Sequence, residues 1–197
     1  MYLGQSSGNI KRAIAHVPFV GTPLTRYLVR KASRVHATGP EGNKSLAAAV
    51  VYLLSRWRLH KFRRMISLCH RGRWVITDRY PQAEVPGFPL DGPGLAAKPA
   101  QGPLARSLAR REQLLYQRMA SFTPALVIRL NVDALTAHAR KPDHELAMLR
   151  HKATLMPTLH FNGAPILDLN ATRPYAEVLA TACRAADRVI EASHAPH

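Results

Sequence analysis

One stretch of the sequence, Trp74-Val75-Ile76-Thr77-Asp78-Arg79-Tyr80, indicates the fold class. It begins as a short apolar run and ends in an acid, a base and a phenol. A basic segment precedes it and a loop rich in proline and glycine follows it, an order typical of a buried parallel strand with charged residues at its carboxyl end. Open α/β sheets bind their ligands at that end of their strands. The stretch therefore predicts a ligand-binding sheet edge at Asp78 and Arg79.

The composition limits the class of protein and of partner. A chain of 197 residues is long enough for one ordinary domain with its own core. Its 28 Lys and Arg against 12 Asp and Glu give a net charge of +16, which predicts anionic partners. Two cysteines, both on predicted apolar helix faces, do not make a disulfide framework, and no apolar run could span a bilayer. We expect a soluble, cytoplasmic protein without a membrane partner.

Apolar periodicity predicts helices that alternate with strands. The longest helix covers residues 45–71 and carries an apolar stripe with steps of three and four residues. Further helices are expected at 104–120, 134–141, 144–156 and 172–190, and strands at 1–4, 74–77, 125–131 and 165–169. Asp133 and Asp143 are the expected N-caps of the two middle helices. The pattern predicts one doubly wound α/β domain over residues 1–190, followed by a disordered tail at 191–197.

Three features of these elements allow two interpretations each. Arg58 is the single charged residue on the stripe of the 45–71 helix, so it either extends past the edge of the core or reaches into a site. The loop from Pro81 to Pro103 has ten Pro or Gly among 23 residues and is either a mobile crossover or a lid that contacts a bound acceptor through Asp91. Arg140 and Lys141 are either helix C-terminal charges or a mobile basic tip.

Four segments together resemble the thymidylate kinase-like branch of the P-loop kinases. They are V-I-T-D-R-Y-P at 75–81, L-D-G-P at 90–93, P-A-L-V-I-R-L-N-V-D at 124–133 and A-R-K-P-D at 139–143. The resemblance runs from about Ser45 to Ile190 and implies a three-layer, parallel-sheet domain of the P-loop NTPase type. It also implies a phosphotransferase that uses ATP and Mg²⁺, acts on a nucleoside monophosphate or another phosphorylated small molecule, and forms a homodimer.

The same resemblance implies roles for individual residues. Phosphoryl transfer requires in-line alignment of the reactants and neutralisation of the moving charge. Asp78 would orient the acceptor or a magnesium-bound water, and Arg79 would hold the acceptor phosphate. Arg140, supported by Lys141, would close over the transferred group, and the turn after the strand near Pro165 would lie beside the adenine. The remaining acceptor contacts would be Arg58, Tyr80 and Asp91.

Two parts of that family's pattern are missing from the sequence. A P-loop kinase needs an apolar strand that leads into G-x-x-x-x-G-K-S/T, whose backbone amides hold the donor phosphates. The nearest string, Gly39 to Ser45, is one residue too short. We therefore expect a longer gene product that begins before Met1, or a remnant, and no phosphoryl transfer by this chain alone. In addition, Pro81 to Pro86 replaces the family's thymine-contacting segment, so the acceptor need not be thymidylate.

A second hypothesis is a non-catalytic basic module that binds nucleic acid or a phosphorylated partner. Its basis is a run of bases with no acid among them, Arg56, Lys61, Arg63, Arg64, Arg71 and Arg73, although such a run is also typical of a solvated helix face. The hypothesis predicts an affinity that falls steeply with salt. Trp57 and Phe62 are expected in the core, which leaves no stacking residues and disfavours nucleic acid. A third hypothesis is an ordinary metabolic protein whose charge reflects arginine usage alone.

Overall fold

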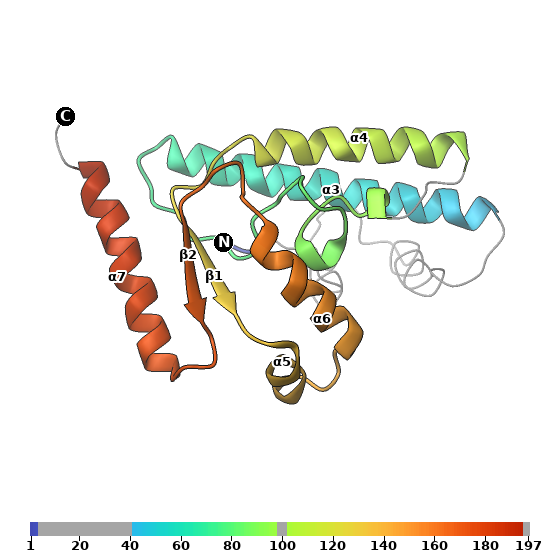
Figure 1. The fold of residues 1–197 in the computed structure, drawn as a ribbon. Helices are drawn as coiled ribbons and strands as arrows, with labels where there is room; N and C mark the ends of the chain where they lie inside the picture. Colours follow the sequence, from blue (N-terminus) through green and yellow to red (C-terminus); the bar gives the residue numbers. More distant parts are fainter. Residues whose placement is uncertain (4–40, 98–101, 195–197) are drawn as a thin grey trace, which may run out of the picture. The chain divides into compact units, whose positions relative to one another are not determined.

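The computed structural model describes residues 1–3, 41–97 and 102–194 (Figure 1). Its elements are α3 (Glu41–Cys69), the short 3-10 helices η1 (Phe88–Leu90) and η2 (Leu95–Ala97), α4 (Pro103–Ala120), β1 (Val127–Asn131), α5 (Ala134–Arg140), α6 (Leu146–Leu155), η3 (Met156–Thr158), β2 (Ile166–Asn170) and α7 (Tyr175–His194). They form two compact units, Met1–Ala120 and Ser121–His197. No helix in the described ranges is long and apolar enough to cross a membrane.

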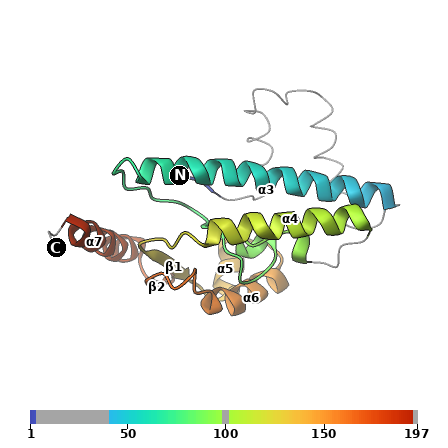
Figure 2. The same cartoon turned by 90° about the horizontal axis from the view of Figure 1, so that it is seen from above.

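The first unit is built on α3 and α4, which lie side by side (Figure 2). The apolar stripe predicted for the first helix is confirmed in part: Phe62 and Met65 are buried against Tyr116 and Met119 of α4, whereas Cys69 at its end is exposed. Leu3, close to the chain start, completes this cluster. The helix begins four residues earlier and ends two residues earlier than predicted. Arg58 lies on the buried stripe and is only 1% exposed.

The buried face of α4 differs from the prediction. We expected Leu104, Leu108, Leu115 and Met119 to face the core, but Leu104 is 55% exposed. The buried residues are Ala105, Leu108, Glu112, Tyr116 and Met119. The helix turns two polar side chains inward because both have hydrogen-bonding partners in the interior, Ser55 for Glu112 and Arg58 for Tyr116. A buried polar group costs little when it is hydrogen-bonded, and polarity alone therefore misplaced this face.

The strand predicted at 74–77 is wrong. Residues 73–77 have no regular secondary structure, and Trp74 and Ile76 are 47% and 84% exposed. The expected first strand is likewise reduced to a single parallel bridge, between Tyr2 and Asp78. The Asp78 N–H donates to the Met1 carbonyl at 3.0 Å and the Asp78 carbonyl accepts from the Leu3 N–H at 3.1 Å. A strand needs a continuous hydrogen-bonding partner, and within the described residues only this short contact is provided.

The second unit contains a two-stranded parallel sheet in which β1 pairs with β2, Val127 opposite Ile166 and Asn131 opposite Asn170. Both strands were predicted, with boundaries within two residues of those observed. The protein is therefore of the α/β class, with a small parallel sheet. The larger three-layer sheet of the P-loop NTPase type stays a prediction.

The helices of the second unit confirm one predicted cap and correct three other predictions, and a fourth correction concerns the two cysteines of the chain. Asp133 caps α5 by accepting a hydrogen bond from the Thr136 N–H at 2.8 Å. The N-cap of α6 is Glu145 instead of Asp143, and its side chain makes no capping bond. The predicted core face of α7 contains no fully buried residue, and the helix continues to His194, into the expected disordered tail. Cys69 and Cys183 are exposed, not on buried apolar faces.

Candidate functional site

Arg58 is the centre of a buried polar cluster in the first unit. Its Nη2 donates to the Arg79 carbonyl at 2.7 Å and to Asp91 Oδ1 at 3.3 Å. Its Nη1 donates to the Tyr116 hydroxyl at 3.3 Å and to the Asp91 carbonyl at 3.4 Å. The guanidinium also lies over the Tyr116 ring, 5.6 Å from the centroid. Arg58 therefore ends in a buried polar cluster and does not extend past the edge of the core.

Asp91 joins Arg58 to Arg79. Its Oδ1 pairs with Arg58 and its Oδ2 lies 3.7 Å from Arg79 Nη1. The Arg79 side chain is 32% exposed, against 1% for Arg58 and 11% for Asp91. Two guanidinium groups share the Asp91 carboxylate, and Arg79 is the one of the two that is accessible to solvent. Such a partly exposed guanidinium is suited to bidentate binding of a phosphate or carboxylate.

The backbone at this cluster is strained at two positions. Arg79 and Asp91, the two residues of the looser ion pair, have φ angles of 61° and 60°. Non-glycine residues rarely occupy this left-handed region, and such residues persist where the surrounding structure enforces them, often at functional sites. The Arg79 carbonyl and the Asp91 carbonyl are both held by Arg58, which explains how the strained conformations are maintained.

The loop that carries Asp91 is organised around the buried side chain of Gln82. Its Nε2 donates to the carbonyls of Val85 at 2.6 Å and Leu90 at 2.9 Å, and its Oε1 accepts from the N–H groups of Glu84 and Val85. The Gln82 N–H also donates to the Asp91 carbonyl at 3.3 Å. The described part of the predicted crossover or lid is thus a packed support, and it directs Asp91 onto the protein's own arginines.

Glu112 extends the polar cluster along α4. Its Oε1 accepts from the Ser55 hydroxyl at 2.6 Å and its Oε2 accepts from the Leu95 N–H at 2.7 Å. Burial raises the pKa of Glu112, although these hydrogen bonds act in the opposite direction. Glu112 connects α3, α4 and the loop at η2, so it holds the frame of the site without facing solvent.

The neighbours of Arg79 in sequence are placed differently. Asp78 is exposed, and its backbone is bonded to Met1 and Leu3. Tyr80 packs its ring edge against Phe62 at 5.7 Å between centroids, and burial raises the pKa of its phenol to about 12. Asp78 is thus accessible for a ligand or a metal-bound water, whereas Tyr80 is a neutral phenol on the apolar cluster.

The described residues offer little to a metal ion. Within them, no group of three or more His, Cys, Asp or Glu side chains could hold one. Magnesium is commonly bound by one or two carboxylates together with substrate phosphates and water. Asp78, as a single exposed carboxylate, fits that arrangement only as one contact through water.

The two bases predicted to form a lid belong to the second unit. Arg140, the last residue of α5, donates from Nη1 to the Ala171 carbonyl at 2.9 Å. Lys141 is the C-cap, and its N–H donates to the carbonyls of Ala137 and His138. Arg140 therefore rests on the turn that follows β2, the segment expected beside the adenine.

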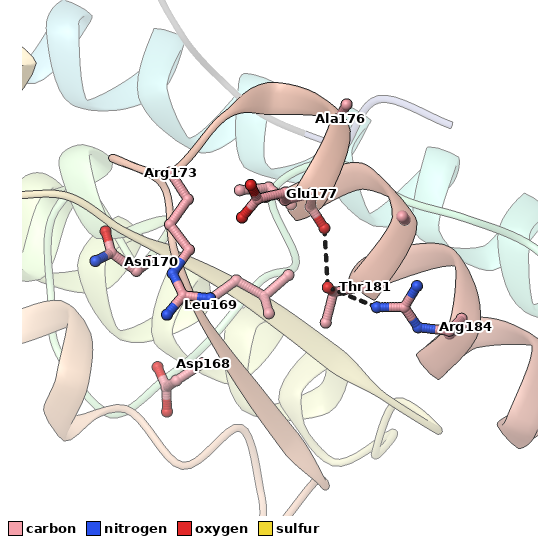
Figure 3. A pocket seen from close by; sticks show the side chains of 10 residues that line it. Asp168, Leu169, Asn170, Arg173, Ala176, Glu177, Thr181 and Arg184 are labelled. Carbon is pink, nitrogen blue, oxygen red and sulfur yellow. Dashed lines mark hydrogen bonds between the residues drawn. The ribbon is translucent and has the colours of Figure 1, made fainter.

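A pocket of about 730 Å³ lies between the end of β2 and the first turns of α7 (Figure 3). Arg184 donates to the Thr181 hydroxyl at 3.1 Å, and that hydroxyl donates to the Glu177 carbonyl at 2.8 Å. Asp168 is paired with Arg129 at 2.6 Å. The other charged groups in the lining are Arg173, Arg184 and Glu177, so the pocket is polar and contains groups of both signs.

Sequence comparison identifies two groups of relatives. The chain is 50% identical over 187 residues to the uncharacterized ATP-binding protein YghS of Escherichia coli K12. The matched region covers 94% of this chain and 78% of YghS. It is 40% identical over 188 residues to the uncharacterized ATP-binding protein YghR of the same strain. That matched region covers 95% of this chain and 75% of YghR. The chain belongs to the YghS/YghR family. No protein-family model matches it, and no solved structure matches it significantly.

For this YghS/YghR family member, sequence reasoning found Arg58, Arg79 and Asp91 but missed the buried polar residues around them. Tyr116 and Gln82 contact this cluster directly, and Ser55 and Glu112 bond to each other beside it. A signal for two of them was present, because Leu108, Glu112, Tyr116 and Met119 follow steps of four, four and three along one helix face. Gln82, inside a loop of Pro and Gly, gave no such signal.

The sheet of the same protein is secured by Arg129. Its guanidinium pairs with Asp168 through two bonds, Nε to Oδ1 at 2.6 Å and Nη2 to Oδ2 at 2.7 Å. Its Nη1 donates to the carbonyls of Met156, Pro157 and Leu159. Asn131 also donates to Asp168, at 2.6 Å. One side chain therefore connects both strands to the segment at η3.

We expect this pair to make stability depend on acid pH. The hydrogen bonds from Arg129 and Asn131 lower the pKa of Asp168 from 3.8 to about 2. A carboxylate with a depressed pKa stabilises the folded state above its unfolded pKa and loses that contribution as pH falls from about 4 to 2. Asp168→Asn should cost about 0.5–1 kcal/mol at pH 6, a value that allows for screening of a half-exposed group. Thermal unfolding at pH 6, 4 and 2 should show this difference disappear; a constant difference would contradict it.

Proposed function

We propose that this protein is an ATP-dependent phosphotransferase of the nucleoside monophosphate kinase type, in which Arg79 binds the phosphate of the acceptor. The observation that carries the proposal is the cluster of Arg58, Asp91 and Arg79, where one guanidinium is fixed in the interior and a second is loosely paired and partly exposed to solvent. A phosphotransferase must hold an anionic acceptor with such groups before any chemistry occurs.

The relatives support the ATP-dependent part of this proposal. YghS and YghR are named ATP-binding proteins, and we infer that this chain shares their ligand. When bound, ATP supplies the phosphoryl group, and Mg²⁺ reduces the repulsion between its phosphates. Asp78 would contact the magnesium through water. Arg140 and Lys141 would neutralise charge on the transferred group after Arg140 leaves the Ala171 carbonyl.

The acceptor class follows from the charge and the frame of the site. A guanidinium favours a phosphomonoester over a neutral nucleoside, because charge-assisted bonds form only to the anion. We propose a nucleoside monophosphate and do not restrict the base to thymine. The sequence contains no G-x-x-x-x-G-K-S/T string for the donor phosphates, so the proposal is tested on binding of the acceptor and not on phosphoryl transfer.

Binding of matched nucleosides tests the proposal. We would titrate the chain by calorimetry with thymidine, uridine, cytidine, guanosine and adenosine, and separately with the monophosphate of each. At least one monophosphate should bind more tightly than its own nucleoside. Arg79→Ala should remove that advantage and weaken the monophosphate about tenfold to a hundredfold, since bonds to a charged group are lost. Arg111→Ala, which removes an exposed arginine from α4, is the matched control and should leave the affinity unchanged. Equal affinity for every nucleoside and its monophosphate would refute the acceptor site.

One observation favours a basic binding module as the second candidate. Arg56, Arg63, Arg64, Arg71 and Arg73 are exposed, and within the described residues none of them makes an ion pair. A phosphate backbone bound there would give an affinity that falls steeply with salt. Oligonucleotide binding that persists in Arg79→Ala but is lost when these arginines are replaced would favour the module over the kinase.

A further inference from the structure

The two arginines of the cluster are held to very different degrees. Arg58 makes four hydrogen bonds, two to Asp91 and one each to Arg79 and Tyr116, and is 1% exposed. Arg79 has its side chain 32% exposed and meets Asp91 only at 3.7 Å. The first guanidinium is a fixed part of the interior. The second is loosely paired and accessible.

We propose that Asp91 is an internal counter-ion that occupies Arg79 in the empty site and releases it to the phosphate of the acceptor. This inference rests on the proposed function and names a division of labour within it. Arg79 binds the ligand, whereas Arg58 is a positioning residue that holds the Arg79 carbonyl and the Asp91 carboxylate in place. The Asp91 carboxylate competes with the ligand for the Arg79 guanidinium, so only a ligand with enough negative charge displaces it.

The geometry makes the release inexpensive. Asp91 uses Oδ1 for Arg58 and Oδ2 for Arg79, so loss of the Arg79 contact leaves a complete buried ion pair behind. A buried carboxylate without any partner would be costly, but Asp91 keeps Arg58 throughout. A phosphate dianion carries more charge than one carboxylate and presents three oxygens to the Arg79 guanidinium, so it competes successfully for it.

A charge-neutral replacement of Asp91 therefore has an unusual expected result. Asp91→Asn keeps the shape of the side chain and the acceptor for Arg58, and asparagine tolerates a φ of 60°. Inorganic phosphate, measured by titration calorimetry, should bind this variant at least about fivefold more tightly than the wild type, because a negative charge about 4 Å from the ligand's arginine is gone. A residue with a merely structural role would weaken binding when replaced. Unchanged or weaker binding to a folded Asp91→Asn variant overturns the proposal.

Two further measurements keep the result interpretable. Asp187→Asn removes an exposed carboxylate of α7 with the same change of charge and should leave phosphate affinity unchanged. If Asp91→Asn does not fold, nitrogen NMR of the wild type tests which arginine binds phosphate. Added phosphate should shift the Arg79 Nε signal and leave the Arg58 Nε signal unchanged. Movement of both signals or of neither overturns the division of labour. Absence of any Arg79-dependent phosphate binding would instead refute the proposed function itself.

Discussion

Arg58→Met should lower the free energy of unfolding of the first unit by about 3–5 kcal/mol, the loss expected when one partner of a buried ion pair is removed. Methionine fills a similar volume, so the change tests the guanidinium and not the packing. The variant leaves Asp91, 8% exposed, with Arg79 at 3.7 Å as its remaining ion pair. It also leaves the strained backbone at Arg79 and Asp91 without the bonds to their carbonyls. Urea unfolding monitored by tryptophan fluorescence measures the loss.

The control for this change is Arg56→Met, which alters an exposed arginine on the same helix and should stay within about 0.5 kcal/mol of the wild type. A double-mutant cycle with Asp91→Asn isolates the pair. The two changes together should cost less than the sum of the single changes by about 1–3 kcal/mol, because each single change already removes the ion pair between Arg58 and Asp91. Additive costs would show that Arg58 and Asp91 do not act on each other.

The position of Arg58 in the interior could be anticipated from the sequence because it follows from helix periodicity. The stripe from Ala47 to Cys69 fixes which side of α3 is buried, and the structure places Phe62 and Met65 there. Periodicity says where a side chain lies but not what it meets. Arg79 and Asp91 are 21 and 33 residues from Arg58 in the chain, and they converge on it only through tertiary structure.

The strand expected before Asp78 failed for a related reason. An apolar run such as Val75 to Thr77 indicates that a segment can form a strand, yet a strand exists only when another backbone pairs with it. Val127 and Ile166 provide such a pair for each other in the second unit. In the part of the chain that the structure describes, the backbone of this run is paired only by the bridge between Tyr2 and Asp78 and by a hydrogen bond from the Met1 amino group to the Ile76 carbonyl. Hydrophobicity of one segment carries no information about the presence of its partner.

The support of the site was hidden by its composition. A loop with ten Pro or Gly among 23 residues was interpreted as a crossover or a lid, because such residues exclude helix and sheet. In the structure the same residues permit tight turns around the buried Gln82 amide, which makes four hydrogen bonds to the loop backbone. In the described part of the loop, proline and glycine content correctly predicted the absence of α-helix and strand, since only the short 3-10 helices η1 and η2 occur there, but it said nothing about whether the loop is packed.

That packing makes Gly92→Ala the second change with a large expected effect. A Cβ at residue 92 would lie 2.0 Å from the Val85 carbonyl oxygen and 2.7 Å from Gln82 Nε2, whereas ordinary contacts begin near 3.4 Å. The obstacle includes backbone, so a side-chain rotation cannot relieve it. We expect a loss of at least about 3 kcal/mol, at the upper end of the costs seen for overpacking. Limited proteolysis should then cleave between Pro81 and Ala97, a segment protected in the wild type.

Gly72→Ala separates this steric effect from a general cost of replacing glycine. Nothing lies within 4 Å of a Cβ at residue 72, and its φ of 71° alone should cost about 1–2 kcal/mol. Cleavage of the 81–97 segment should be unchanged in that variant. If Gly92→Ala were as stable as Gly72→Ala and equally resistant to protease, the prediction would be wrong. The Val85 carbonyl oxygen could then not lie within contact distance of a Cβ at residue 92. Asp91, the next residue in the chain, would then lack the rigid support that aims its carboxylate at Arg58 and Arg79, because that support depends on the same turn.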